Sequence, residues 1–94
     1  MQIRSFSNKR LKEFYEEGIT AGLPAGSVAK LRAMLAVLDQ MKDVSELAVF
    51  PLWRVHTLTG DRRGTWSLHV TRNRRLTFRV DGDELVDLNI EDYH

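Results

Sequence analysis

Residues 65–91 read TWSLHVTRNRRLTFRVDGDELVDLNIE, and this stretch decides the fold. Apolar and polar side chains alternate along it in three runs, at 66–70, 76–80 and 86–90. A period of two is typical of β-strands that bury one face and expose the other. Turn-forming residues separate the runs, and Asp81-Gly82 is a strong hairpin signal. We therefore expect neighbouring antiparallel strands in this half of the chain.

A shorter alternating run, at 53–56, precedes these strands, and a turn-rich segment at 59–64 follows it. We expect a fourth strand there, with Trp53 and Trp66 on the buried side of the sheet. Because helices are available to cover one face only, the polar side chains should lie together on the other face. That face would gather Arg54, His56, Ser67, His69, Arg75 and Arg79.

The first half of the chain has the spacing of helices. Asn8 can cap a first helix of about ten residues that stops at Gly18, where glycine allows a left-handed end. A second helix is expected to open at Pro24 and to end near Asp43, with room for an extra turn at 46–47.

Together these elements predict an α+β fold: a twisted antiparallel sheet with two to three N-terminal helices packed on one face. A short strand is also expected at 2–6. A length of 94 residues suits one small domain, so we expect residues 1–94 to form a single unit. The chain has no cysteine, which removes disulfides and thiolate chemistry. No apolar stretch could span a bilayer or serve as a signal segment, so we expect a cytoplasmic protein with no membrane partner.

Charge is distributed unevenly, although the formal net charge is only +1. Residues 52–79 contain no lysine and one acidic residue, Asp61, but seven arginines: Arg54, Arg62, Arg63, Arg72, Arg74, Arg75 and Arg79. Residues 80–94 reverse the sign, with six acidic residues and no basic one. A guanidinium binds phosphate through two parallel hydrogen bonds and stacks on bases, so the arginines favour a nucleic-acid partner. The alternative is a solvated strand face paired with the acidic tail.

Four segments of this half resemble the HigB toxins of the RelE superfamily: HTLTGD at 56–61, GTWSLHV at 64–70, NRRLTF at 73–78 and EDYH at 91–94. The resemblance extends over essentially the whole chain. It implies a bacterial type II toxin, an endoribonuclease (mRNA interferase) that cleaves messenger RNA in the ribosomal A site and so blocks translation. It also implies an inhibiting helix-turn-helix antitoxin of the HigA type, the 70S ribosome as a partner, and a microbial-ribonuclease-like fold.

Two positions depart from the family pattern. HigB toxins usually read Leu-Lys-Gly where this chain has Thr59 in the middle position, so a lysine expected near the scissile phosphate is missing. The usual Asn-Trp-Arg is here Asn73-Arg74-Arg75. An arginine could replace the lysine, and the sequence leaves the choice open among Arg54, Arg62, Arg63 and Arg74.

Metal-independent RNA cleavage uses the 2′-hydroxyl as nucleophile and needs a base, an acid and a cation that stabilises the transition state. Two histidines near pH 7 can serve as base and acid. The resemblance implies that His56 and His94 are the base and the acid, and the sequence leaves open which is which. It implies that Arg75 stabilises the phosphate. Tyr93 would stack on or orient the substrate, and Asp92 would support the neighbouring groups.

The remaining basic residues would contact RNA: Arg54, Arg62, Arg63, Arg74 and Arg79. The resemblance gives His69 no role, so we expect it to be structural or a minor RNA contact. The basic block contains no carboxylate-rich cluster, so we expect no metal and no cofactor.

Two other functions are compatible with the sequence. The basic face could bind RNA or the ribosome without cutting, a reading that the loss of lysine at Thr59 favours. The gyrase-inhibiting ParE branch of the same superfamily would share the fold, but it would not need His56 or the terminal Asp-Tyr-His.

Overall fold

The computed structural model describes residues 1–93, and it has the expected α+β architecture. The elements in chain order are β1 (Gln2–Ile3), α1 (Lys9–Glu17), α2 (Val28–Gln40), the 3₁₀ helices η1 (Val44–Val49) and η2 (Pro51–Trp53), β2 (His56–Thr57), a third 3₁₀ helix η3 (Gly60–Arg62), β3 (Thr65–Thr71), β4 (Arg74–Asp81) and β5 (Glu84–Asp92). Among the described residues, no helix has the length and apolar character that a membrane crossing requires.

The strands form one sheet in the order β1-β5-β4-β3-β2. The pairs β2–β3, β3–β4 and β4–β5 are antiparallel, as expected, but β1 runs parallel to β5, so the sheet is mixed. The prediction of a wholly antiparallel sheet was wrong at this edge. A parallel pair needs a long crossover connection, and the helices between β1 and the other strands provide it.

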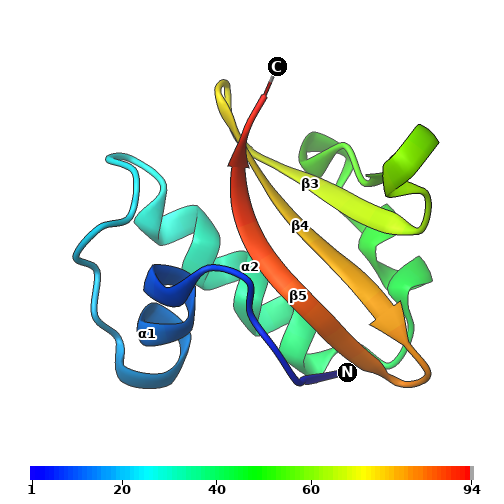
Figure 1. Ribbon diagram of the computed structural model, residues 1–94, viewed down its shortest axis with the longest axis horizontal. Coiled ribbons are helices and arrows are strands. Elements are labelled where there is room, and N and C mark those ends of the chain that lie inside the picture. The colour runs from blue at the N-terminus through cyan, green and yellow to red at the C-terminus, as the bar shows by residue number, and fades with distance from the viewer. Residues whose placement is uncertain (94) are drawn as a thin grey trace.

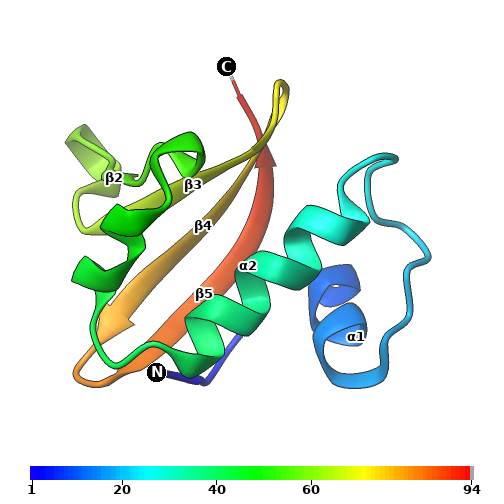
Figure 2. The same cartoon turned by 180° about the vertical axis from the view of Figure 1, so that it is seen from behind.

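One face of the sheet packs on α2, and the other is open. Figure 2 shows α2 crossing in front of β5, while Figure 1 looks onto the face that no helix covers. The core between helix and sheet is made of large apolar side chains, including Leu31, Met34, Leu38, Leu68, Leu76, Phe78 and Leu88, each fully buried. The expected separation of an apolar and a polar face is therefore confirmed.

The first helix follows its predicted boundaries. The Asn8 side chain accepts a hydrogen bond from the backbone N–H of Leu11, and Gly18 ends α1 in the left-handed region. The second helix begins later than predicted, at Val28 rather than Pro24. Gly26, with φ +79°, interrupts a helical path, so the residues from Pro24 form a turn.

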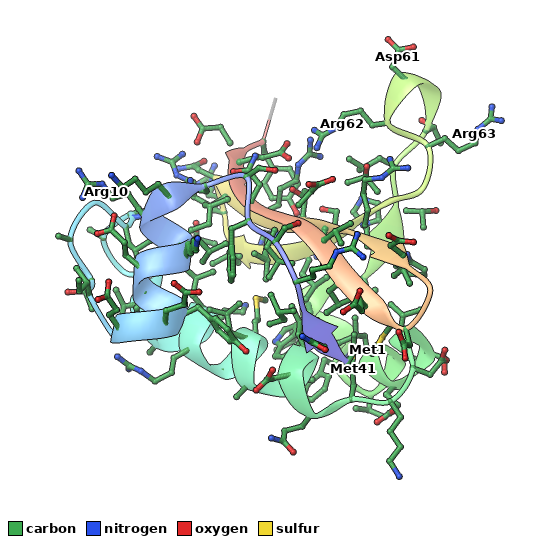
Figure 3. The ribbon with its side chains drawn as sticks, turned by 60° about the horizontal axis from the view of Figure 1, so that its bottom comes forward. Met1, Arg10, Met41, Asp61, Arg62 and Arg63 are labelled. Carbon is green, nitrogen blue, oxygen red and sulfur yellow. The ribbon has the colours of Figure 1, made fainter. Side chains whose placement is uncertain are left out.

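The end of α2 also differs from the prediction. The helix stops at Gln40 instead of near Asp43, and the expected extra turn is the separate helix η1. The amino group of Met1 donates hydrogen bonds to the carbonyls of Leu38 and Asp39, at 3.0 and 3.3 Å, and to that of Met41 (Figure 3). A positive charge at a helix C-terminus is favourable, so this contact ties β1 to the end of α2.

The strand predicted at 53–56 was largely wrong, because only His56 of this run belongs to a strand. Trp53 belongs to η2, where it is buried and stacks on Phe50, and Trp66 is half-buried against the core, so both tryptophans pack as expected. Arg54 adopts a left-handed conformation with φ 47°, which breaks the alternation. The strand β2 is thus reduced to His56 and Thr57.

A β-bulge interrupts β5 at Asp87. The cross-strand register passes from Thr77–Asn89 to Arg79–Val86, and Asp87 has φ 58°. The extra residue reverses the alternation, because two residues of β5 lie opposite one residue of β4. Val86 therefore lies on the open side beside Arg79, and its predicted place in the helix-facing core was wrong.

The bulge gives a prediction about stability. Asp87→Val should lower the free energy of unfolding by about 1 to 2 kcal/mol, because a branched side chain fits poorly at positive φ, whereas Asp87→Gly should be neutral or slightly stabilising. Urea denaturation measures both changes. Asp83→Val, at an exposed aspartate with an ordinary φ, is the control, and a loss there equal to that of Asp87→Val would contradict the prediction.

Candidate active site

The open face of the sheet carries three rows of cross-strand neighbours. The rows are His69, Arg75 and Glu91; His56, Ser67, Thr77 and Asn89; and Thr65, Arg79 and Val86. Directly opposed residues on neighbouring strands point to the same side of a sheet. The structure thus brings together five of the six polar side chains expected on this face, and Arg54 lies in the loop just before β2.

Glu91 is the centre of the polar contacts. Its carboxylate accepts two hydrogen bonds from the guanidinium of Arg62, both at 2.5 Å, one from the Thr77 hydroxyl at 2.6 Å and one from Arg75 Nη2 at 3.3 Å. The bonds from Arg62 and Thr77, with the charges of Arg62 and Arg75, outweigh partial burial and lower the pKa of Glu91 to about 2. Glu91 is therefore ionised throughout the physiological pH range.

Arg75 is held on two sides. One edge of its guanidinium contacts Glu91, and the group lies over the Tyr93 ring, with 5.6 Å from Cζ to the ring centroid. Arg75 Nε and the hydroxyl of Ser67 are buried and have no hydrogen-bond partner among the described residues. Buried polar groups normally find partners, so the absence of any partner among residues 1–93 is unusual at both atoms.

Tyr93 links the end of the chain to this cluster. Its backbone N–H donates to the carbonyl of Asn73 at 3.0 Å, which holds the tail beside the turn between β3 and β4 (Figure 1). The Tyr93 hydroxyl lies 3.2 Å from Nδ1 of His69. Burial, with the charges of Arg54 and Lys30, lowers the pKa of His69, which favours a neutral imidazole at pH 7.

His56 is exposed on the same face, one row away from His69. Its Nδ1 lies 2.7 Å from the carbonyl oxygen of Arg54. A carbonyl can only accept, so Nδ1 carries a proton and donates it in this contact. The other ring nitrogen, Nε2, is then the one able to exchange a proton in neutral imidazole. The predicted partner of His56, His94, lies outside the described residues.

Asp92 is not brought to this cluster. It is the cross-strand neighbour of Arg74 and forms an ion pair with it. Successive residues of a strand point to opposite faces, so this pair lies on the other side of the sheet from Arg75 and Glu91. Within residues 1–93, Asp92 makes no ion pair or side-chain hydrogen bond with His56, Arg75 or Tyr93, and its supporting role stays a prediction.

The arginines proposed to replace the missing lysine differ in their surroundings. Arg62 is bound to Glu91 and Arg74 to Asp92. In Figure 3, Arg62 points from η3 back over the sheet, whereas Arg63 points away from it. Arg54 is exposed, and its charge acts on His69. The structure thus leaves Arg54 as the candidate that lies near the histidines and pairs with no carboxylate among residues 1–93.

A polar pocket of about 340 Å³ adjoins Glu91. Arg62, Arg79, Thr77 and Asn89 contribute to its walls. Within residues 1–93, no group of three or more His, Asp or Glu side chains is arranged to hold a metal ion. The pocket presents the guanidinium groups of Arg62 and Arg79 beside the carboxylates of Asp87 and Glu91.

Two members of the cluster were missed in the sequence. Glu91 was given no role, although the strand register places it directly opposite Arg75. His69 was expected to be structural or a minor RNA contact, yet it lies beside Tyr93. Both residues lie within the segments that resemble the family, but those segments give neither a role, and only the strand register reveals their positions.

The chain was compared with known proteins. It matches the family described as "RelE-like toxin of type II toxin-antitoxin system HigB" over residues 4–94. "Endoribonuclease HigB" of Proteus vulgaris is 41% identical over 93 residues, which cover 98% of this chain and 99% of that protein. The solved "YoeB/ParE toxin from Agrobacterium tumefaciens" has a TM-score of 0.60 at 16% identity and full coverage of both chains. A chain of the "YoeB-YefM complex from Staphylococcus aureus" has a TM-score of 0.56 at 18% identity, covering 100% of this chain and 99% of that one.

The two solved structures share the fold of this chain. The family match spans nearly all of the sequence, and the Proteus relative is similar over its full length. The resemblance inferred from the four sequence segments is therefore confirmed, and an antitoxin is the partner that a type II system implies. The chain belongs to the HigB family of RelE-like toxins of type II toxin–antitoxin systems.

Proposed function

We propose that this protein is an endoribonuclease that cleaves translated mRNA in the ribosomal A site. The observation that carries the proposal is the guanidinium of Arg75, fixed by Glu91 and Tyr93 but with a buried Nε–H that lacks a partner among the described residues. A phosphate oxygen is the natural acceptor for such a donor. The name of the Proteus vulgaris relative, an endoribonuclease, supports the same reaction.

Cleavage would use the 2′-hydroxyl of the mRNA as nucleophile. A base takes its proton, the 2′-oxygen forms a bond to phosphorus, the bond from phosphorus to the 5′-oxygen breaks, and an acid protonates that oxygen. Arg75 would stabilise the negative charge that builds up on the phosphate. His56, through Nε2, and His94 would share the base and acid roles, and Tyr93 would orient the substrate. No resident metal is assigned to the reaction.

The partners follow from the charge of the open face. The 70S ribosome and its mRNA would meet Arg54, Arg63 and Arg79, which are exposed on or beside this face. Counter-ion release would make such binding strongly salt-dependent. The inhibiting antitoxin would be a helix-turn-helix protein of the HigA type, and the setting would be the bacterial cytoplasm, where translated mRNA is found.

The activity can be tested in living bacteria. Induction of this chain without its antitoxin should arrest growth, and primer extension should reveal new ends within codons on translated messages only, because cleavage requires the ribosome. A matched message without a start codon is the control. Intact messages accompanied by DNA breaks would assign the protein to gyrase inhibition instead, and intact messages on stalled ribosomes would indicate binding without cleavage.

The role of Arg75 can be tested by substitution. Arg75→Ala should reduce the cleavage rate by about 10² to 10³, the usual effect of removing one group that stabilises transition-state charge. Arg75→Lys should lose less, because lysine keeps the charge without the fork of donors. Arg72→Ala, at an exposed arginine in the turn between β3 and β4, should cleave like the wild type. Equal rates for the wild type and Arg75→Ala would remove Arg75 from the site.

Glu91 makes stability depend on pH. Its pKa lies at about 2 in the folded protein, below the ordinary 4.5, so its ionised form stabilises the fold above about pH 4.5. That contribution is lost as the pH falls through 4.5 towards 2. Urea unfolding should therefore show Glu91→Gln less stable than the wild type at pH 7, with the difference shrinking below pH 4.5. Glu84→Gln, in a more solvent-screened pair with Arg4, should show a smaller difference, and a constant gap for Glu91→Gln would contradict the assignment.

A further inference from the structure

His69 and Tyr93 form a pair that the proposed reaction does not yet use. The hydroxyl of Tyr93 lies 3.2 Å from His69 Nδ1, and the two ring centroids are 5.5 Å apart with an interplanar angle of 37°. The same tyrosine ring lies under the guanidinium of Arg75. His69 is also the direct cross-strand neighbour of Arg75. The three side chains therefore form one continuous contact, His69 to Tyr93 to Arg75.

The groups that surround the imidazole of His69 favour its neutral form. Arg54, Lys30 and Arg75 are positive and lie near it, and Glu91, the acidic group in the same row, is held by Arg62 and Thr77. Partial burial, with the charges of Arg54 and Lys30, opposes protonation of His69. A neutral imidazole carries one N–H, so Nδ1 accepts from the Tyr93 hydroxyl when that proton lies on Nε2 and donates to the hydroxyl oxygen when it lies on Nδ1.

We propose that His69 is a positioning residue for RNA cleavage, which accepts the hydrogen bond of Tyr93 and so fixes the tyrosine ring against Arg75. Without it, the contacts of Tyr93 with the described residues are its backbone bond to Asn73 and the Arg75 guanidinium over its ring. The proposal rests on the endoribonuclease activity, because it names a further residue of that site.

Protonation of His69 would reverse its function. In the imidazolium form both ring nitrogens donate, so Nδ1 can no longer accept from Tyr93. Because the pKa of His69 is lowered, the ring stays neutral and Nδ1 stays able to accept at neutral pH. The hydrogen bond from Tyr93 is lost only when the pH falls far enough to protonate the ring. The groups that would feel this change are Tyr93, Arg75 and Glu91 on the sheet, Arg54 in the loop before β2 and Lys30 on α2.

Two substitutions separate positioning from packing. His69→Ala should slow cleavage on programmed ribosomes about tenfold, the value of one hydrogen bond to a placed group, while the Kd for the ribosome stays unchanged. His69→Asn should recover most of the rate, because its side-chain oxygen is as many bonds from the backbone as Nδ1. Since asparagine does not titrate, the loss of rate on acidification should also be weaker in His69→Asn than in the wild type. Thr71→Ala, on the same strand, is the control for local packing.

A double-mutant comparison tests whether His69 acts through Tyr93. Adding His69→Ala to Tyr93→Phe should cause little further loss, since the hydroxyl that His69 accepts is already absent. In the free protein, nitrogen NMR should find His69 protonated on Nε2, with a signal at Nδ1 that shifts in Tyr93→Phe. The positioning role alone would be overturned if His69→Ala cleaved as fast as an active wild type. It would also be overturned if the losses of rate from His69→Ala and Tyr93→Phe were fully additive in the double variant. A wild type that cuts no message would overturn the proposed function itself, and the positioning role with it.

Discussion

The ionised carboxylate of Glu91 is the contact on which the open face depends. It joins three parts of the chain that are distant in sequence: Arg62 from η3, Thr77 and Arg75 from β4, and its own strand β5. A partly buried carboxylate is stable only when its oxygens are paired, and here four donor contacts pair them. The same contacts hold η3 over the sheet and orient the guanidinium of Arg75. The position of the loop and the arrangement of charges therefore depend on the same carboxylate.

The bulge at Asp87 determines that Glu91 reaches this face at all. Leu85 is fully buried in the helix-facing core, and unbroken alternation would point Glu91 to the same side as Leu85. The extra residue shifts the alternation by one, so that Leu88 enters the core and Glu91 and Tyr93 belong to the open side. The bulge that brings Glu91 to the open face thus requires a strained, left-handed backbone at Asp87.

Much of this arrangement could be predicted from the sequence, and the exceptions have physical causes. Alternation identified β3, β4 and β5, and the caps at Asn8 and Gly18 fixed α1. The parallel pairing of β1 is decided by tertiary contacts, and the bulge has no local signal, because aspartate tolerates positive φ without requiring it. The basic face could be foreseen from strand patterning, but Glu91 and His69 gain their roles through cross-strand register, which a single strand does not specify.

The central claim is that the open face, organised by Glu91, presents Arg75 to the scissile phosphate. A structure of the protein on a 70S ribosome, with a message made uncleavable by 2′-O-methylation at the cut site, tests it most directly. We expect Nε of Arg75 to donate to a phosphate oxygen of the A-site codon, while Glu91 still accepts the hydrogen bonds of Arg62. A message bound to another surface, or an Arg75 that turns away from the phosphate, would contradict it.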